Sequence, residues 1–179
     1  MTGATSSRET SIPDVRKTIV VPATPERAYE LFVSHPLDWW PPTHVLVKGR
    51  RTEMSFGRHP GEPYFERDAE GNTEIWGHML EVSPAQRLLF TWQINGRWQA
   101  ITDQSKSSRI EVTFAPTSDR SGTTVELAHI ELDRHGADGH FIFNALQGPS
   151  PGETLQRFHD FVAAHRPFSM STSSDGDPT

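Results

Sequence analysis

Alternation of apolar and polar residues in the middle of the chain limits what this sequence can fold into more than any other feature. Residues 87–94 carry a large apolar side chain at every second position: Leu88, Phe90, Trp92 and Ile94. Side chains two residues apart share one face of a β-strand, so this run predicts a strand with one buried face. Similar runs predict six or so antiparallel strands between Val45 and Leu132, the clearest at residues 73–82, 87–94, 108–116 and 123–132.

Helix signals stand on both sides of these strands. After a first predicted strand at residues 16–23, Thr24 and Pro25 mark the start of a short helix as its N-cap and first helical residue. Residues 150–165 form the most clearly marked helix, with Ser150 as the expected N-cap. This order predicts an α+β fold with the helices on one face of a curved antiparallel sheet. One helix cannot fill the concavity of such a sheet, so the space left there is the expected ligand site.

The tandem indoles Trp39 and Trp40 follow the first predicted helix and precede Pro41 and Pro42. Two adjacent side chains cannot share one stripe of a helix or one face of a strand. We therefore expect one indole to anchor the helix pair to the core and the other to line the mouth of a cavity. The sequence leaves open which indole does which.

Composition limits the classes of function. With 179 residues and 34% hydrophobic content, the chain fits one domain, expected at residues 14–168 between disordered tails at 1–13 and 169–179. The net charge of −6 argues against nucleic acid as a partner, and the absence of cysteine excludes disulfides and thiolate chemistry. No apolar run approaches the ~20 residues of a membrane span, and no signal peptide is evident. We therefore expect a cytoplasmic protein with no membrane partner.

Candidate binding residues are the aromatic and histidine side chains that strand alternation or loop position directs toward the cavity. His129 continues the inward phase of Val125 and Leu127, where an imidazole can orient a ligand or act as a general base; the alternative is a hydrogen-bonded core histidine. For the aromatic side chains, core packing is the alternative. These side chains are Trp39, Trp40, Tyr64, Trp76, His78, Phe90, Trp92, Trp98 and His129.

Metal and carboxylate chemistry have weaker signals. No histidine pair has strong ligand spacing, and the loop from His135 to His140 is expected to be solvated, so we expect no metal ion. The acidic residues around the turn at Gly71 are also expected to be solvated rather than catalytic: Glu66, Asp68, Glu70 and Glu74.

The segments TPERAYELF, DWWPP, WGHMLEVSPAQRLLFTWQI, SRIEVTFAP and GTTVELAHIEL, in this order, resemble one branch of the START-like (birch-pollen-allergen, SRPBCC) superfamily, the activator-of-heat-shock-protein-ATPase-like branch. The resemblance covers residues 15–165. It implies a helix-grip fold, in which a curved antiparallel sheet wraps around a long C-terminal helix and two short helices follow the first strand. It also implies a hydrophobic cavity that binds lipids, polyketides or other aromatic metabolites without a cofactor.

Three further features resemble the START-like self-resistance proteins of enediyne producers, including the one that acts against calicheamicin. They are the Trp-Trp-Pro turn, the W-x-x-N-G tract ending at Gly96 and the H-x-x-x-D-R tract from His129 to Arg134. This likeness implies that a reactive ligand would meet the backbone at Gly96, whose missing side chain leaves its Cα open to approach. Arg97 and Trp98 depart from that pattern, and an ordinary turn glycine is the alternative.

Three functions follow. The first is non-catalytic binding of a bulky hydrophobic or aromatic small molecule, polyketide-like and including an enediyne or its precursor, in secondary metabolism or antibiotic self-resistance. The second is a polyketide cyclase or dehydratase that uses His129 as its base. The third is a chaperone-regulating interaction module. In each case we expect a monomer or homodimer without a cofactor.

Overall fold

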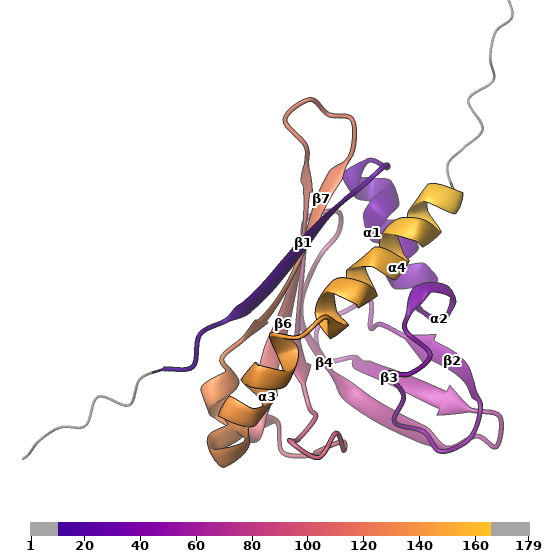
Figure 1. Cartoon of the computed structure of the whole chain (residues 1–179). Helices are drawn as coiled ribbons and strands as arrows, with labels where there is room; N and C mark the ends of the chain where they lie inside the picture. The colour runs from indigo at the N-terminus through magenta and orange to yellow at the C-terminus, as the bar shows by residue number, and fades with distance from the viewer. Residues whose placement is uncertain (1–10, 166–179) are drawn as a thin grey trace, which may run out of the picture.

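Seven antiparallel strands form one curled sheet in the computed structural model, which describes residues 11–165 (Figure 1). The sheet and its helices confirm the predicted α+β helix-grip fold. The spatial order of the strands is β1-β7-β6-β5-β4-β3-β2. Their bounds are β1 Val15–Val21, β2 Arg51–Ser55, β3 Pro63–Asp68, β4 Thr73–Ser83, β5 Arg87–Trp92, β6 Ser108–Pro116 and β7 Thr123–Ile130.

Helix α4 crosses the open side of the curled sheet, and α3 precedes it at one end (Figure 1). The helices are α1 Pro25–Ser34, α2 Pro36–Trp39, α3 Gly139–Leu146 and α4 Ser150–Ala164, and two 3₁₀ turns are η1 Gln104–Lys106 and η2 Leu132–Asp138. The predicted N-cap of α1 is confirmed, because the hydroxyl of Thr24 accepts from the backbone N–H of Arg27 at 3.3 Å. The predicted cap of α4 is wrong. Pro149 occupies the N-cap position, and the Ser150 hydroxyl pairs with the His44 ring instead.

The predicted tails lie outside the described residues, apart from residues 11–13. There Ile12 is buried against the core, and its backbone N–H donates to Asp133 Oδ1 at 2.9 Å.

The concave face of the sheet carries the core. The side chains of β5, β6 and β7 that were predicted to point inward are buried, and α4 packs its apolar stripe toward them. The buried residues of these elements include Leu88, Phe90, Trp92, Ile110, Val112, Phe114, Val125, Leu127, Leu155, Phe158 and Val162. The alternation of apolar side chains therefore correctly predicted which face of β5, β6 and β7 is buried.

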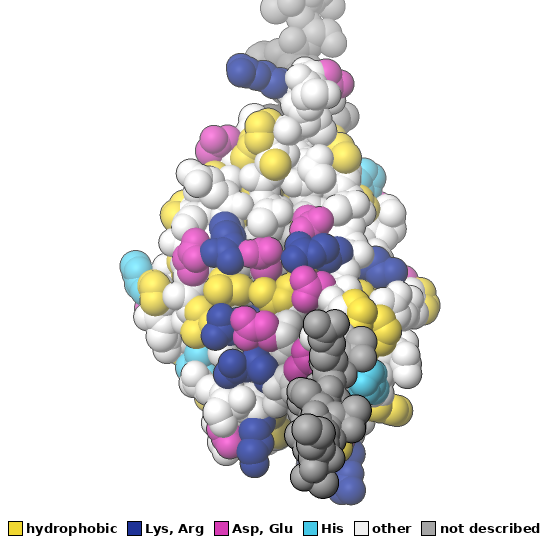
Figure 2. Space-filling view, turned by 90° about the vertical axis from the view of Figure 1, so that its left-hand side faces the viewer, with side chains coloured by type: hydrophobic (Ala, Val, Ile, Leu, Met, Phe, Trp, Pro, Cys, Tyr) yellow, Lys and Arg dark blue, Asp and Glu magenta, His cyan; other side chains and the backbone are white. Residues whose placement is uncertain are grey.

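Several ion pairs lie on the convex face. Arg87 Nε donates to Glu111 Oε2 at 2.7 Å, and Arg16 contacts both Glu111 and Glu126, which links β5, β6, β7 and β1. Figure 2, which views the molecule from the side of β1 in Figure 1, shows acidic and basic side chains interleaved there. Because exposed pairs of this kind contribute little stability, they chiefly keep this face solvated.

Strand β4 is where the sheet bends. Its pairing shifts register against β3 beside Tyr64 and against β5 beside Met79. Such bulges bend a strand and increase its twist. Between them lies Gly77, where an added Cβ would stand 1.8 Å from the carbonyl oxygen of Thr91. A side chain at Gly77 is therefore incompatible with the contact between β4 and β5 that curls the sheet.

We expect Gly77→Ala to lower the free energy of unfolding by roughly 1–3 kcal/mol or more, because the backbone must shift to admit the methyl group. Urea denaturation measures the loss. The matched control is Gly152→Ala in α4, where an added Cβ meets nothing within 4 Å, so stability should hold or rise slightly. Equal stability of the two variants would contradict the close approach at Gly77.

Candidate functional site

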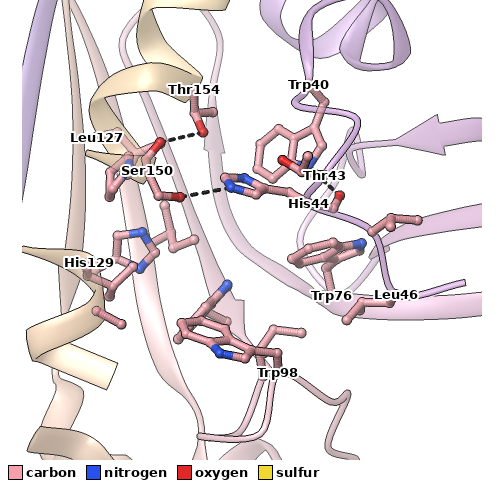
Figure 3. Close-up of a pocket in the computed structure, with 17 residues that line it drawn as sticks. Trp40, Thr43, His44, Leu46, Trp76, Trp98, Leu127, His129, Ser150 and Thr154 are labelled. Carbon is pink, nitrogen blue, oxygen red and sulfur yellow. Dashed lines mark hydrogen bonds between the residues drawn. The ribbon is translucent and has the colours of Figure 1, made fainter. Parts of the chain in front are cut away.

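A cavity of about 280 Å³ lies between the concave face of the sheet, the segment after α2 and the first turn of α4 (Figure 3). This volume is near the lower end of typical ligand pockets, ~300–1,000 Å³. The cavity is mostly apolar, with a few polar side chains from separate elements. Its lining is Trp40, Thr43, His44, Val45, Leu46, Trp76, Trp92, Ile94, Trp98, Ile110, Leu127, His129, Ala145, Leu146, Ser150, Pro151 and Thr154.

The end of α2 separates the two indoles. Trp39 is the last helical residue, whereas Trp40 has extended backbone angles, φ −61° and ψ 137°. Trp39 is 1% exposed and packs between Phe32 and Phe158, at ring-centroid distances of 4.6 and 5.0 Å. Trp40 lines the cavity. Trp39 is therefore the expected anchor of the helix pair, and Trp40 is the indole at the cavity.

The cavity brings together half of the predicted set: Trp40, Trp76, Trp92, Trp98 and His129. The other five lie outside its lining. Trp39, Tyr64 and Phe90 are buried in the core, and Tyr64 stacks on Phe56 at 4.4 Å. Half-buried His78 places its Nδ1 2.7 Å from Gln93 Oε1, and Gly96 lies in the turn after β5.

Burial of Tyr64 raises the pKa of its phenol well above its ordinary value, and the nearby charge of Glu66 adds to that rise. Its hydroxyl has no hydrogen-bond partner within the described part of the chain. Tyr64 therefore stays a neutral phenol in an aromatic cluster.

Glu66 fixes the segment that carries Trp40 and His44. Its Oε1 accepts from the backbone N–H of Leu46 and, at 2.7 Å, from that of Val47; its Oε2 lies 3.2 Å from an Arg51 nitrogen. The same guanidinium donates to the carbonyl oxygen of His44 at 2.8 Å. A buried carboxylate on β3 therefore holds one wall of the cavity.

The expectation that the acidic residues of this hairpin are solvated is wrong for two of them. Glu66 and Asp68 are only 0% and 2% exposed. Each is surrounded by donors: Asp68 Oδ1 accepts from the backbone N–H of Asn72 at 2.8 Å and from that of Glu70 at 3.1 Å. Hydrogen bonds from Asn72 first, and then from backbone N–H groups, lower the pKa of Asp68.

His129 lines the cavity with a neutral imidazole. It is 6% exposed, and burial, reinforced by the neighbouring His135, lowers its pKa to about 3. Trp92 packs edge-on against it, with ring centroids 5.2 Å apart. Its Nδ1 is buried and has no hydrogen-bond partner among the described residues. An unmet buried nitrogen of this kind is costly.

This burial predicts a pH-dependent loss of stability. The pKa of His129 is ~6.5 in the unfolded chain and about 3 in the folded protein. At a pH between these two values His129 binds a proton only in the unfolded chain, so lowering the pH favours unfolding. We expect the unfolding free energies of the wild type and His129→Phe to diverge by about 1.4 kcal/mol per pH unit between about pH 6 and 4, the variant gaining relative stability. Denaturant titrations across that range measure the difference. A difference that does not change with pH would contradict the buried neutral state.

Sequence reasoning missed His44 and Ser150. The Nε2 of His44 lies 2.9 Å from Ser150 Oγ, and both side chains line the cavity (Figure 3). Thr154, one turn further along α4, donates its hydroxyl to the Ser150 carbonyl at 3.0 Å. The two members of the pair are 106 residues apart in the chain, and no spacing rule connects them.

Trp98 stands at the edge of the cavity. It is 47% exposed and has a left-handed backbone, φ 59°, which is unusual for a large side chain. Its indole packs against Trp92 at 6.2 Å and against the exposed Phe141 of α3 at 6.4 Å. Gly96, in the same turn, donates its N–H to Asp138 Oδ2 at 3.0 Å, which ties the turn to η2.

Comparisons with known proteins agree with this architecture. The family model for Activator of Hsp90 ATPase homolog 1-like proteins matches residues 22–146. The chain belongs to this family. Membership confirms the resemblance to that branch of the START-like superfamily. No match is found among curated proteins.

Solved structures extend the comparison. A structure described as an anthrahydroquino-γ-pyrone synthase, Txn09, is 50% identical, with 84% of this chain and 97% of that chain covered and a TM-score of 0.58. The self-sacrificing resistance protein CalC from Micromonospora echinospora is 24% identical, with 86% and 96% covered and a TM-score of 0.62. A structural-genomics protein from Nitrosomonas europaea is 15% identical, with 86% and 96% covered and a TM-score of 0.59. The last two likenesses show the shared fold.

Two features are not found within residues 11–165. No helix there has the length and apolar character needed to cross a membrane. No cluster of three or more His, Cys, Asp or Glu there could hold a metal ion.

Proposed function

We propose that the cavity binds an aromatic polyketide and that the protein closes a γ-pyrone ring on it. The observation that carries this proposal is the 50% identity, over 84% of the chain, to a structure described as an anthrahydroquino-γ-pyrone synthase. Both the 50% identical synthase and the family membership favour a polyketide-related ligand. A cyclase therefore takes precedence over a non-catalytic binder.

Ring closure sets clear chemical demands. A γ-pyrone fused to an aromatic ring forms when a phenol oxygen bonds to the β carbon of a neighbouring ketone side chain. If that carbon belongs to a second carbonyl, the phenol proton and one α proton leave with its oxygen as water. If it belongs to an alkyne conjugated with the ketone, the proton ends on the α carbon and nothing leaves. Neither route needs an oxidant or a reductant.

His129 suits the phenol end of this reaction. Burial keeps its ring neutral and Nδ1 has no partner among the described residues, so the imidazole can accept a hydrogen bond from the phenol and take its proton only as the phenol ionises beside it. The ion pair that forms as the phenol ionises offsets the cost of charging a buried imidazole. The surrounding indoles supply flat apolar surfaces for the fused rings, namely those of Trp40, Trp76, Trp92 and Trp98.

The size of the cavity defines how the ligand would lie. A volume of about 280 Å³ suits the reacting end of a fused aromatic ligand better than its whole length. We propose that the remainder extends past Trp98, the exposed indole of the lining. Gly96 has no assigned part in this reaction.

The test is conversion of an ortho-hydroxyaryl ketone whose side chain carries a β carbonyl or a conjugated alkyne, on a reduced three-ring scaffold, followed by mass spectrometry and tryptophan fluorescence. Four of the five tryptophans line the cavity, so binding should quench most of the emission. We expect quenching together with enzyme-dependent formation of the γ-pyrone. Quenching without product would support the non-catalytic binder and overturn the cyclase. The absence of both quenching and product would overturn both the binder and the cyclase.

A further inference from the structure

We infer that Ser150, oriented by His44, donates a hydrogen bond to the ligand's carbonyl oxygen as negative charge develops there during ring closure. This inference rests on the proposed function, in which attack by the phenol oxygen moves electron density onto that carbonyl. His129 serves the phenol, and a separate group is needed for the carbonyl. Ser150 and His44 line the same cavity as His129 and are hydrogen-bonded to each other at 2.9 Å.

The chain holds His44 in place before any ligand arrives. Its carbonyl oxygen accepts from Trp40 Nε1 at 3.2 Å and from Arg51 at 2.8 Å. The Trp40 indole also packs edge-on against the imidazole, with centroids 6.4 Å apart. Preorganised donors stabilise a transition state without having to reorganise during the reaction.

The direction of the hydrogen bond decides what Ser150 can do. With its proton on Nε2, the imidazole of His44 donates to Ser150 Oγ. The hydroxyl hydrogen of Ser150 is then free to point at a ligand oxygen. Figure 3 shows His44 reaching from its loop to Ser150 on α4, with His129 on the β7 side.

The charges around this pair fit a neutral donor. Burial lowers the pKa of His44; Glu153 on α4 opposes that shift, and Arg51 on β2 adds to it. Ser150 is also the first residue of α4, whose N-terminal end carries a partial positive charge that favours a developing anion. The buried side chain of His129 lines the same cavity, and its Nδ1 has no partner in residues 11–165, which independently indicates a polar ligand there.

The hydroxyl of Ser150 is not used by the helix. Among the described residues no side chain caps α4, although Ser150 lies at its first turn and serine is a favoured cap. The hydroxyl instead pairs with a side chain from the other wall of the cavity. We therefore assign Ser150 as the donor and His44 as the residue that positions it.

The first test is steady-state kinetics with Ser150→Ala. If the Ser150 hydroxyl acts mainly in the transition state, its removal should lower kcat by about 10²–10³-fold and change KM less than about threefold. The Kd from tryptophan quenching should change as little as KM. The matched control is Ser34→Ala on α1, whose hydroxyl donates to Glu30, and its kinetics should equal those of the wild type.

The second test separates positioning from packing. His44→Gln keeps a side-chain N–H that can donate to Ser150, whereas His44→Phe keeps the ring shape without a donor. We expect His44→Gln to stay within about tenfold of wild-type kcat and His44→Phe to fall as far as Ser150→Ala. Nitrogen-15 chemical shifts of His44 should show the proton on Nε2 at neutral pH.

The outcomes distinguish this inference from the proposed function. No conversion by the wild type would overturn the proposed function, and this inference with it. Conversion by the wild type with an unchanged kcat in Ser150→Ala would overturn this inference alone. A proton on Nδ1, or equal losses in His44→Gln and His44→Phe, would also overturn the assigned role of His44.

Discussion

Replacing Glu66 with glutamine should lower the free energy of unfolding by about 3–5 kcal/mol, the usual cost of breaking a buried ion pair. The variant leaves the Arg51 side chain, 9% exposed, without its carboxylate. It also weakens the acceptor for two backbone N–H groups, those of Leu46 and Val47. Because these groups fix the segment that carries Trp40 and His44, ligand quenching should weaken as well. Urea denaturation and fluorescence titration measure the two effects.

The neighbouring pair of Glu53 and Arg67 is the matched control. It joins the same two strands, but its side chains are 44% and 45% exposed. Glu53→Gln should therefore cost less than about 1 kcal/mol and leave quenching unchanged. Similar losses for the two variants would show that burial of Glu66 does not set the strength of its interactions.

His129→Phe should lower the turnover number by about 10²–10⁴-fold, the range for loss of a general base. Phenylalanine keeps the ring shape against Trp92 and leaves no unmet polar atom, so the fold should persist. Binding should weaken far less than turnover, because the cavity keeps its four indoles. Stopped-flow or mass-spectrometric assays of product, paired with quenching titrations, separate the two quantities.

His159→Gln provides the comparison for that variant. His159 lies on the outside of α4 and pairs with Asp160 at 3.0 Å, away from the cavity lining. Its substitution should leave turnover unchanged. If His129→Phe also kept its turnover, the assignment of the base would be wrong even if the protein proved to be a cyclase.

The strands and the inward phase of His129 could be predicted because both follow from period-two alternation, a local property of the sequence. The division of labour between Trp39 and Trp40 could not, because it depends on where α2 stops, and helix ends are weakly encoded. Glu66 looked solvated because its neighbours in sequence flank a turn. Its partners come from the segment before β2, some twenty residues earlier.

The pairing of His44 with Ser150 shows the same limit more clearly. A serine before Pro151 has every local feature of a helix cap, yet its hydroxyl faces a histidine from the segment after α2, 106 residues earlier in the chain. Only the closure of the sheet brings the two together. Contacts between side chains on opposite walls of the cavity are therefore the part of the site that is hardest to predict from the sequence.

The cavity walls come from segments scattered between Trp40 and Thr154, so the cavity exists only when the chain is folded. A ligand that binds the folded state alone raises stability by mass action, by about 2.7 kcal/mol at a concentration of 100 Kd. For a domain of this size that corresponds to a rise of roughly 5–10 °C in the melting temperature. The melting temperature thus reports how much of the cavity is occupied by ligand, whatever the reaction is. A library of aromatic metabolites can therefore be ranked by the melting temperature of this protein alone.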